Sequence, residues 1–304
     1  MRKREEWLIK ISPRKFEKSF KERQSTMSKA RKLRNIYTTF PEGRHKVLTL
    51  SYDDGKIPDR KLVALFNEHG LKGTFNVNSG LEKNKFKNDY DERIPMSEYK
   101  KLYKGHEIAC HSVLHPTIAR SPKEQMVRQI IEDRRSLEEI MGYTVRGFAY
   151  PNGSCSEDVK DALKACGIRH ARTVASTHSY DMPTDFLMWN PTCHHGDSSF
   201  EDLYKDFIKV HKRQYMYMLY VWGHSYEFER DKNFDIIEKF SKKIENKSDI
   251  WYATNIEIVD YLDRAERVQV SVNGDFAYNP SAESIWLEVD KKIIELKGGK
   301  CTEL

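Results

Sequence analysis

Two adjacent aspartates, Asp53 and Asp54, end a short apolar run and precede Gly55. Each carboxylate disfavours ionisation of the other, and a bound divalent cation relieves that cost. Taken alone, the pair also fits an ordinary polar turn, because Asp-Gly is common in turns. The pair is therefore informative only together with other metal-binding groups.

His111 and His115 supply such groups. Their i, i+4 spacing predicts two imidazoles on one face of a helical turn, close enough to bind one ion together. With one carboxylate they form a facial set that leaves coordination positions open, which suits zinc, iron, cobalt or manganese. Such a metal lowers the pKa of bound water and polarises a carbonyl oxygen. Two surface histidines would show the same spacing.

A third candidate is His224, which follows Gly223 at the end of the apolar run 216–222. Imidazole can protonate a departing amine, because its pKa lies near working pH. A histidine buried in the core is the alternative interpretation of this position.

The elements that position these groups alternate between strand and helix from about Lys46 onward. This alternation predicts a parallel sheet, either open or closed into a barrel. The active site of a barrel lies at the carboxyl ends of its strands, so the aspartate pair, His111, Asn152 and His224 are expected at one mouth. The predicted strands are 47–51, 73–77, 107–110, 147–150, 216–222 and 250–253, and the predicted helices begin at residues 59, 122 and 156.

The helix predicted over 122–141 has the clearest end signals. Ser121 and Glu124 have the spacing of a capping box, and Gly142 is placed to end the helix. Its apolar stripe consists of Met126, Ile130, Leu137 and Met141.

The chain on either side of this core has other patterns. Residues 1–45 are rich in lysine and arginine and predict a basic N-terminal extension with weak helical periodicity. Residues 46–263 form the predicted catalytic domain, and residues 264–304 alternate with period two and predict a small β appendage. A basic arm can bind nucleic acid or anionic lipid, but a solvated extension explains it as well. We expect no nucleic-acid partner.

Composition limits the protein class. The 304 residues carry a formal net charge of +6 and are 38% hydrophobic, which indicates a globular protein with a polar surface. No apolar stretch approaches the ~18 residues of a membrane span, so no membrane insertion is expected. The first residues lack the apolar stretch of a secretory signal, which predicts a cytoplasmic protein. The five cysteines lack CxxC spacing and are expected to be reduced thiols.

Four segments, in order along residues 45–263, carry a family resemblance. Residues 49–55, Thr-Leu-Ser-Tyr-Asp-Asp-Gly, resemble the first motif of the NodB-like polysaccharide deacetylases, carbohydrate esterase family 4. His111 to His115 is similar to the HxxxH motif of that family. Residues 148–153, Phe-Ala-Tyr-Pro-Asn-Gly, resemble its third motif, and residues 219–224 resemble its fifth. The resemblance implies a distorted (β/α) barrel, and the variant third motif looks like that of a bacterial subgroup.

The resemblance also implies roles. Asp53 is similar to the general base, Asp54 to a metal ligand acting with His111 and His115, and His224 to the acid that protonates the leaving sugar amine. A backbone N–H in the 150–152 turn would stabilise the oxyanion. The expected cofactor is one divalent metal ion, first Zn²⁺, with Co²⁺, Ni²⁺, Mn²⁺ or Fe²⁺ as alternatives. The expected substrate is an N-acetylated saccharide, with O-acetyl groups as an alternative.

Two departures from the family pattern leave questions open. The third motif of the family places an arginine after the phenylalanine to orient the base, and this chain has Ala149 there. Arg172 is a candidate replacement, whereas Arg146 lies upstream and is a weaker one. The fourth motif has acids before a tryptophan, and here Asp185 lies four residues before Trp189, which is a partial match.

Substrate contacts are expected from polar and aromatic groups near the mouth, because aromatic faces stack on sugar rings. For Trp222, core packing is the stronger expectation because of its strand position. His194 and His195 either line the site or are structural. The full set of candidate substrate contacts is Tyr150, Asn152, Trp189, His194, His195 and Trp222.

Three functions are compatible with these residues. The first is a metal-dependent hydrolase that removes acetyl groups from a carbohydrate. The second is a hydrolase of a non-sugar amide or cyclic imide on the same scaffold. The third is a non-catalytic sugar-binding relative, which the missing arginine favours and the retention of both Asp53 and His224 disfavours.

Overall fold

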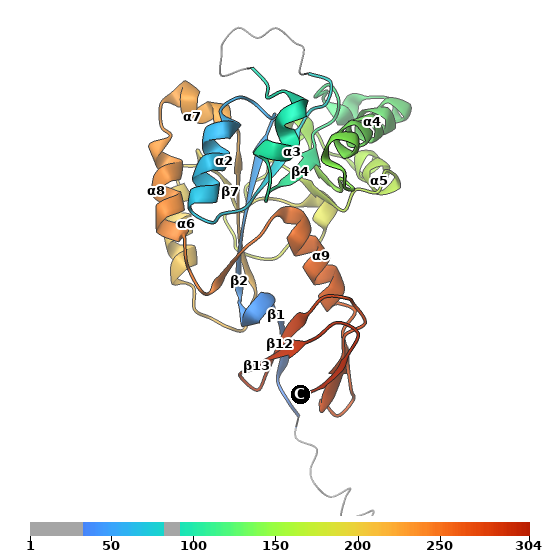
Figure 1. Cartoon of the computed structure of the whole chain (residues 1–304), viewed down its shortest axis with the longest axis vertical. Coiled ribbons are helices and arrows are strands. Elements are labelled where there is room, and N and C mark those ends of the chain that lie inside the picture. The colour runs from blue at the N-terminus through green and yellow to red at the C-terminus, as the bar shows by residue number, and fades with distance from the viewer. Residues whose placement is uncertain (1–32, 82–91) are drawn as a thin grey trace, which may run out of the picture.

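A single sheet of parallel strands forms the centre of the computed structural model, which describes residues 33–81 and 92–304. Its strand order is β6-β5-β4-β3-β2-β8-β7, and β9 also pairs with β2 (Figure 1). The strands are β2 (Lys46–Asp53), β3 (Gly73–Val77), β4 (Glu107–Cys110), β5 (Gly147–Ala149), β6 (His170–Arg172), β7 (Cys193–His194), β8 (Tyr217–Gly223) and β9 (Ile250–Tyr252).

Strand β2 is the axis of this sheet. All eight of its residues are buried, and its pairing with β8 runs from Lys46 to Tyr52. Its other edge is divided, because β9 pairs with residues 46–48 and β3 with residues 50–53. This arrangement bends the sheet into an incomplete barrel, and the predicted distorted (β/α) barrel is confirmed.

Helices cover the outside of the sheet in two groups. Figure 1 shows α2, α6, α7 and α8 on one flank and α4 and α5 on the other. The helices are α2 (Asp59–Glu68), α3 (Tyr99–Leu102), α4 (Lys123–Met141), α5 (Glu157–Ala165), α6 (Phe200–Lys209), α7 (Ser225–Asp231), α8 (Asp235–Ile244) and α9 (Asn255–Ala265). Short 3-10 turns are η1 (Pro41–Gly43), η3 (Met96–Glu98), η4 (Ile118–Arg120), η5 (Pro151–Gly153) and η6 (Phe186–Met188).

Helix α4 presents its predicted apolar stripe to the sheet and ends as expected at Gly142, which has a left-handed φ of 76°. The predicted capping box at its start does not form. Pro122 occupies the N-cap position, and the N–H of Ser121 bonds the carbonyl of Ile118 at the end of η4. Ser121 therefore ends the preceding turn η4, and helix α4 begins one residue later than the capping signal indicates.

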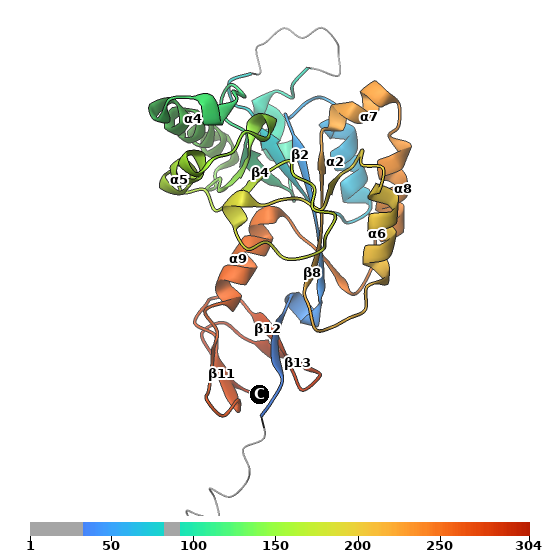
Figure 2. The same ribbon diagram turned by 180° about the vertical axis from the view of Figure 1, so that it is seen from behind.

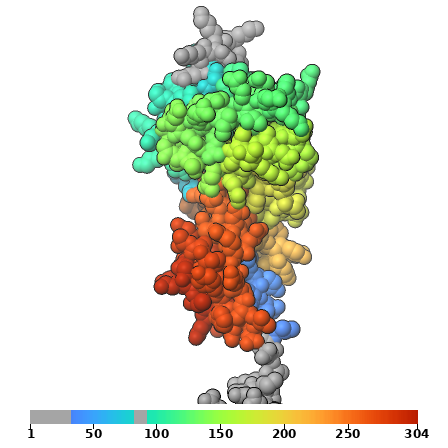
Figure 3. All heavy atoms as spheres, turned by 90° about the vertical axis from the view of Figure 1, so that its right-hand side faces the viewer, coloured from blue at the N-terminus to red at the C-terminus, as the bar shows by residue number. Residues whose placement is uncertain are grey.

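A smaller lobe of two antiparallel sheets lies beyond α9 (Figures 2 and 3). One sheet joins β1 (Ile36–Thr39), β12 (Ile285–Val289) and β13 (Lys292–Leu296), and the other joins β10 (Gln269–Val270), β11 (Phe276–Tyr278) and β14 (Cys301–Glu303). Strand β1 precedes the barrel in sequence but pairs with β12, with Ile36 opposite Val289. The lobe thus takes a strand from the segment that we assigned to the basic extension.

Most of that predicted extension, residues 1–32, lies outside the described residues. Among the helices of the described segments, none is both long and apolar enough to cross a bilayer.

Candidate active site

The carboxyl ends of the parallel strands bring the predicted chemical groups together. Asp53 is the last residue of β2, His111 follows β4, and Arg172 is the last residue of β6. His224 follows β8 directly. Interactions within 4 Å link Asp53 to His111, Arg172 and His224. The prediction that these strand ends share one mouth is therefore confirmed for this group.

Asp54, His111 and His115 offer one ligand atom each, and the three atoms lie within 4.8 Å of one another. The Nδ1 atom of His111 donates a hydrogen bond to the carbonyl of Ala149 at 2.8 Å, which leaves the lone pair on Nε2. That Nε2 atom is buried and has no hydrogen-bond partner among the residues that the structure describes. A buried polar atom without a partner is costly, whereas imidazole nitrogen and carboxylate oxygen are zinc-type ligands. The residues present fit a divalent metal ion.

Burial lowers the pKa of His111 to about 4, although the charges of Asp53 and Asp54 act in the opposite direction. His111 is therefore neutral at working pH, as a metal ligand must be. Burial acts to raise the pKa of Asp54, but electrostatic interactions, with His111 and Arg93 first, hold that pKa below its usual range. The acid ligand is therefore ionised.

The two histidines meet through a loop and not through a helical turn, which corrects the prediction from their spacing. Ser112 and His115 have left-handed φ values of 62° and 53°, which non-glycine residues seldom adopt. The Nδ2 atom of Asn78 donates to the carbonyls of His111 and Ser112 at 2.6 and 2.9 Å. The N–H of His115 donates to the Ser112 hydroxyl at 3.1 Å. These bonds hold a conformation that the i, i+4 spacing does not require.

Asp133 of α4 supports the same loop from beneath. Its carboxylate is fully buried and accepts the backbone N–H of His111 at 2.9 Å and that of Ser79 at 2.8 Å. Burial raises the pKa of Asp133 to about 6, although these hydrogen bonds lower it. Sequence reasoning missed this residue, yet there was a signal, because Asp133 is the one charged member of the apolar stripe of α4.

Asp53 forms an ion pair with Arg172 that is almost entirely closed to solvent. The other carboxylate oxygen accepts from Nδ2 of Asn76 at 2.8 Å. Arg172 also donates from Nε to the Ser51 hydroxyl at 3.2 Å, and its guanidinium lies 4.3 Å from the ring centre of Trp222. Burial acts to raise the pKa of Asp53, but the charge of Arg172, with smaller contributions from His111 and His224, lowers it to about 2.

Of the two arginines considered from sequence, Arg172 is therefore the one that reaches Asp53. Arg146 forms a two-point pair with Asp260 on α9, at 2.7 Å for each contact. That pair lies at the opposite end of the strand from the site, since Arg146 precedes β5.

His224 completes the cluster on the other side of Asp53. Its Nε2 atom lies 4.0 Å from Oδ2 of Asp53, and its Nδ1 atom lies 3.2 Å from Oε2 of Glu227. Burial acts to lower the pKa of His224, but the contact with Glu227 and the charges of Asp53 and Asp54 raise it above its usual value. Sequence reasoning missed Glu227. Its signal was a glutamate at the third position of a helix, where the side chain returns to the N-cap residue.

Several predicted substrate contacts prove to be core residues. Trp189 is fully buried, with its ring centre 4.9 Å from that of Tyr220. Tyr150 is 1% exposed and its hydroxyl donates to the carbonyl of Leu187 at 2.7 Å. Neither ring presents a face to a sugar. Trp222 packs on Arg172 and is 9% exposed, in line with the stronger expectation for it.

The remaining candidates differ in exposure. The side chain of His194 is 26% exposed, whereas His195 is buried. Asn152 is exposed on the turn after β5. Asp185 is not part of the cluster, because it caps η6 through the N–H of Leu187 at 2.8 Å and contacts Lys160 at 3.1 Å.

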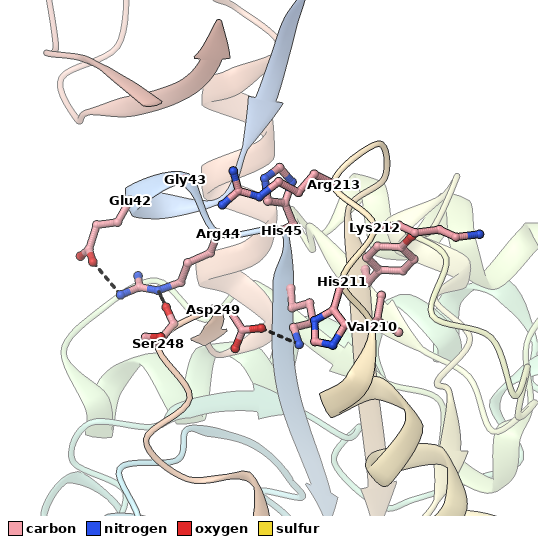
Figure 4. A pocket seen from close by; sticks show the side chains of 12 residues that line it. Glu42, Gly43, Arg44, His45, Val210, His211, Lys212, Arg213, Ser248 and Asp249 are labelled. Carbon is pink, nitrogen blue, oxygen red and sulfur yellow. Dashed lines mark hydrogen bonds and ion pairs between the residues drawn. The ribbon is translucent and has the colours of Figure 1, made fainter. Parts of the chain in front are cut away.

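A separate pocket of about 360 Å³ lies where β2 begins, at the opposite end of that strand from Asp53 (Figure 4). It is rich in basic groups, but Lys46 contacts Asp249 at 2.7 Å and Arg44 contacts Glu42 at 2.6 Å. The pocket holds none of the candidate catalytic residues.

Comparison with known proteins relates part of the chain to a family. Residues 40–171 match the family model described as polysaccharide deacetylase. No curated protein matches the sequence. A crystal structure of a Mycobacterium smegmatis protein assigned as a polysaccharide deacetylase shares 16% identity and a TM-score of 0.56, covering 76% of this chain and 94% of that one.

A second solved structure is the Xyl-CE4 domain of a multidomain xylanase from the hindgut metagenome of Trinervitermes trinervoides. It shares 14% identity with a TM-score of 0.50, over 75% of this chain and 94% of that one. A CE4 family pseudoenzyme from Bacillus anthracis shares 15% identity, over 74% of this chain and 68% of that one, with a TM-score of 0.46. By this match, residues 40–171 carry a polysaccharide deacetylase domain, and the solved structures share its fold.

Proposed function

We propose that this chain is a metal-dependent hydrolase that removes N-acetyl groups from a carbohydrate and releases acetate. One observation carries the proposal. Oδ2 of Asp53 lies 3.8 Å from Nε2 of His111 and 4.0 Å from Nε2 of His224. A carboxylate between a candidate metal ligand and a candidate acid has the placement that a general base needs.

Asp54, His111 and His115 would hold the metal ion, with Zn²⁺ favoured by the nitrogen and oxygen donors. When bound there, a divalent ion polarises the acetyl carbonyl and makes water more acidic.

Asp53 and His224 then carry out the two proton transfers of the reaction. Asp53 is ionised at working pH, because its pKa falls to about 2, and it takes a proton from the attacking water. The hydroxyl of that water adds to the acetyl carbon, and the amide C–N bond breaks. His224, with its raised pKa, gives its proton to the departing nitrogen. The products are acetate and a free amino sugar.

A backbone N–H near the turn after β5 would stabilise the oxyanion. The N–H of Tyr150 already donates to the carbonyl of Arg172 at 3.0 Å, and Pro151 has none. Asn152, whose φ of 57° turns the chain at this point, is therefore the residue of the turn that we assign to this role.

The ion pair of Asp53 weakens the alternative of a non-catalytic sugar-binding protein. The missing arginine after Phe148 was the best argument for that alternative, but Arg172 forms an ion pair with Asp53 in this chain. A hydrolase of a non-sugar amide would use the same residues, so only its substrate distinguishes it from the function that we propose.

Acetate release tests the proposal. The purified chain, loaded with Zn²⁺, is assayed on N-acetylated chito-oligosaccharides, acetylated xylan and a ureide. We expect acetate from the first substrate, loss of turnover with normal metal content in Asp53→Asn, and loss of both in His111→Ala. Turnover of the ureide alone would identify the chain as a hydrolase of non-sugar amides. A wild-type rate in Asp53→Asn would show that Asp53 is not the base.

A further inference from the structure

Three imidazoles surround one oxygen atom beside the active site. Oε2 of Glu227 lies 3.0 Å from Nε2 of His194, 3.4 Å from Nε2 of His195 and 3.2 Å from Nδ1 of His224. The same oxygen accepts the backbone N–H of His224 at 3.1 Å. His194, at the end of β7, and His195, which follows it, thus share the carboxylate of Glu227 with the candidate acid, and we call these four residues the Glu227 cluster.

The protonation of His194 follows from its other nitrogen. Nδ1 of His194 accepts a hydrogen bond from the backbone N–H of Gly196 at 3.0 Å. A neutral imidazole has one donor and one acceptor nitrogen, so the proton of His194 is on Nε2, the atom that faces Glu227. A nitrogen that carries its proton cannot bind a metal ion.

His195 is oriented by packing. Its ring lies between those of Phe228 and Tyr52, with ring centres 4.1 and 5.7 Å away. Its Nδ1 faces Gly223, where an added Cβ would lie only 2.0 Å away, and this nitrogen has no hydrogen-bond partner within 33–81 and 92–304. Burial lowers the pKa of His195 to about 3, so the ring is neutral and its Nε2–H is the group that faces Glu227.

We propose that His194 and His195 are positioning residues, which direct their Nε2–H groups at Glu227 and thereby reduce the negative charge that its carboxylate presents to His224, without contacting the substrate. The inference rests on the proposed function, in which His224 is the acid. It replaces our expectation that the two histidines line the sugar site.

In the Glu227 cluster, three imidazoles interact with the negative charge of one carboxylate. Donors on His194 and His195 compete with His224 for one oxygen, so their loss leaves more of the negative charge to act on His224. Glu227 itself stays in place, because the backbone N–H of His224 still binds it and Nη2 of Arg230 lies 3.8 Å from Oε1.

Other charged or titratable groups near the cluster come from the end of β2 and from α7. Asp53 is the last residue of β2 and Asp54 follows it, and Arg230 and Asp231 belong to α7. The ring of Tyr226 lies 5.2 Å from that of His224. None of these is altered by a substitution at His194, so a change in the titration of His224 reports on the cluster.

A matched pair of variants at the partly exposed His194 tests the proposal. His194→Leu removes the donor, and His194→Gln keeps a donor near the position of Nε2. We expect the pKa of His224, followed by NMR with labelled histidine, to rise in His194→Leu and to match the wild type in His194→Gln. We expect kcat to fall about tenfold in the first variant and less than threefold in the second, with KM nearly constant in both.

Two results would overturn the proposal. The first is a raised KM in both variants with an unchanged or lowered pKa of His224 in His194→Leu, which would make His194 a substrate contact. The second is binding of two Zn²⁺ ions by the wild type and one by His194→Leu, which would make the cluster a second metal site. The NMR titration needs no substrate, so it tests the inference even where acetate release fails and the proposed function falls.

Discussion

The guanidinium of Arg172 and the carboxylate of Asp53 form a buried ion pair between the ends of β6 and β2. Those strands are separated in the sheet by β5, β4 and β3, so the arginine spans the mouth of the barrel to reach Asp53. The guanidinium lies over the face of Trp222, and the pair is closed to solvent. Asp53 is thus held by a residue from β6, although the family pattern places its arginine on β5.

Replacing Arg172 by methionine is expected to reduce kcat by at least about 100-fold, because Asp53 loses the group that orients it. The pKa of Asp53 should rise from about 2, which moves the acid limb of the pH–rate profile to higher pH. A pH profile of kcat/KM measures both effects. Arg146→Met, which breaks the distant pair with Asp260, is the control and should keep the wild-type profile.

The same ion pair predicts a pH dependence of stability. The pKa of Asp53 is lower in the folded chain than its ordinary value of 3.8, so its contribution is present above about pH 4 and is lost as pH falls towards 2. The contribution is about 2 kcal/mol at neutral pH. Urea unfolding at pH 7 and pH 3 should show a smaller difference in Asp53→Asn than in the wild type; equal differences would contradict the lowered pKa.

Replacing Asp133 by asparagine should weaken metal binding by about 10–100-fold, because an amide cannot accept the N–H groups of both His111 and Ser79 in the same way. Competition with a chelator measures the Zn²⁺ affinity directly. Glu132→Gln on the same helix is the control, since Glu132 pairs with the exposed Arg135 at 2.8 Å. Unchanged affinity in Asp133→Asn would show that the loop keeps its shape without this carboxylate.

Activity should be lost at high pH as His224 loses its proton. Because Glu227 raises the pKa of His224, the alkaline limb lies above the ordinary histidine range in the wild type. Glu227→Gln removes the negative charge, so the limb should move to lower pH while the acid limb stays in place. An alkaline limb that does not move would show that Glu227 does not raise the pKa of His224.

The free energy of unfolding is expected to be lower by about 1–3 kcal/mol in Gly223→Ala than in the wild type. The reason is that the added methyl group would lie 2.0 Å from Nδ1 of His195. His195 has little room to move between Tyr52 and Phe228. Gly196→Ala is the control, since its methyl group would lie 3.1 Å from His194. Thermal unfolding of both variants checks the prediction, and similar losses in the two would contradict it.

The strand ends could be predicted from sequence because each is marked by an apolar run that stops at a polar residue. Strands β3 and β4 were predicted with the bounds that the structure has, and the runs before Asp53 and His224 were placed correctly. Parallel strands share a direction, so predicting the strands was enough to predict that Asp53, His111 and His224 meet.

The support of the site could not be predicted in the same way. The i, i+4 spacing of His111 and His115 has the same appearance in a loop as in a helix, and the loop conformation depends on Asn78 and Asp133 from other elements. Arg172 ends a strand of three residues, too short for a periodic signal. Such long-range contacts depend on tertiary packing, which a local pattern does not encode.

The burial of Trp189 and Tyr150 could not be predicted from local sequence patterns either. Trp189 and Tyr150 were expected at the mouth because of their neighbours in the chain. In the fold they pack against Tyr220 and η6, because aromatic side chains bury large areas wherever the packing allows.

We expect Asp54, His111 and His115 to bind one divalent ion beside Asp53. Zinc content and anomalous X-ray scattering at the zinc edge, measured on Zn²⁺-loaded crystals of the wild type and of His115→Ala, test it most directly. We expect one anomalous peak in contact with all three side chains in the wild type, and its loss in His115→Ala. A peak elsewhere, or none in fully loaded protein, would contradict it.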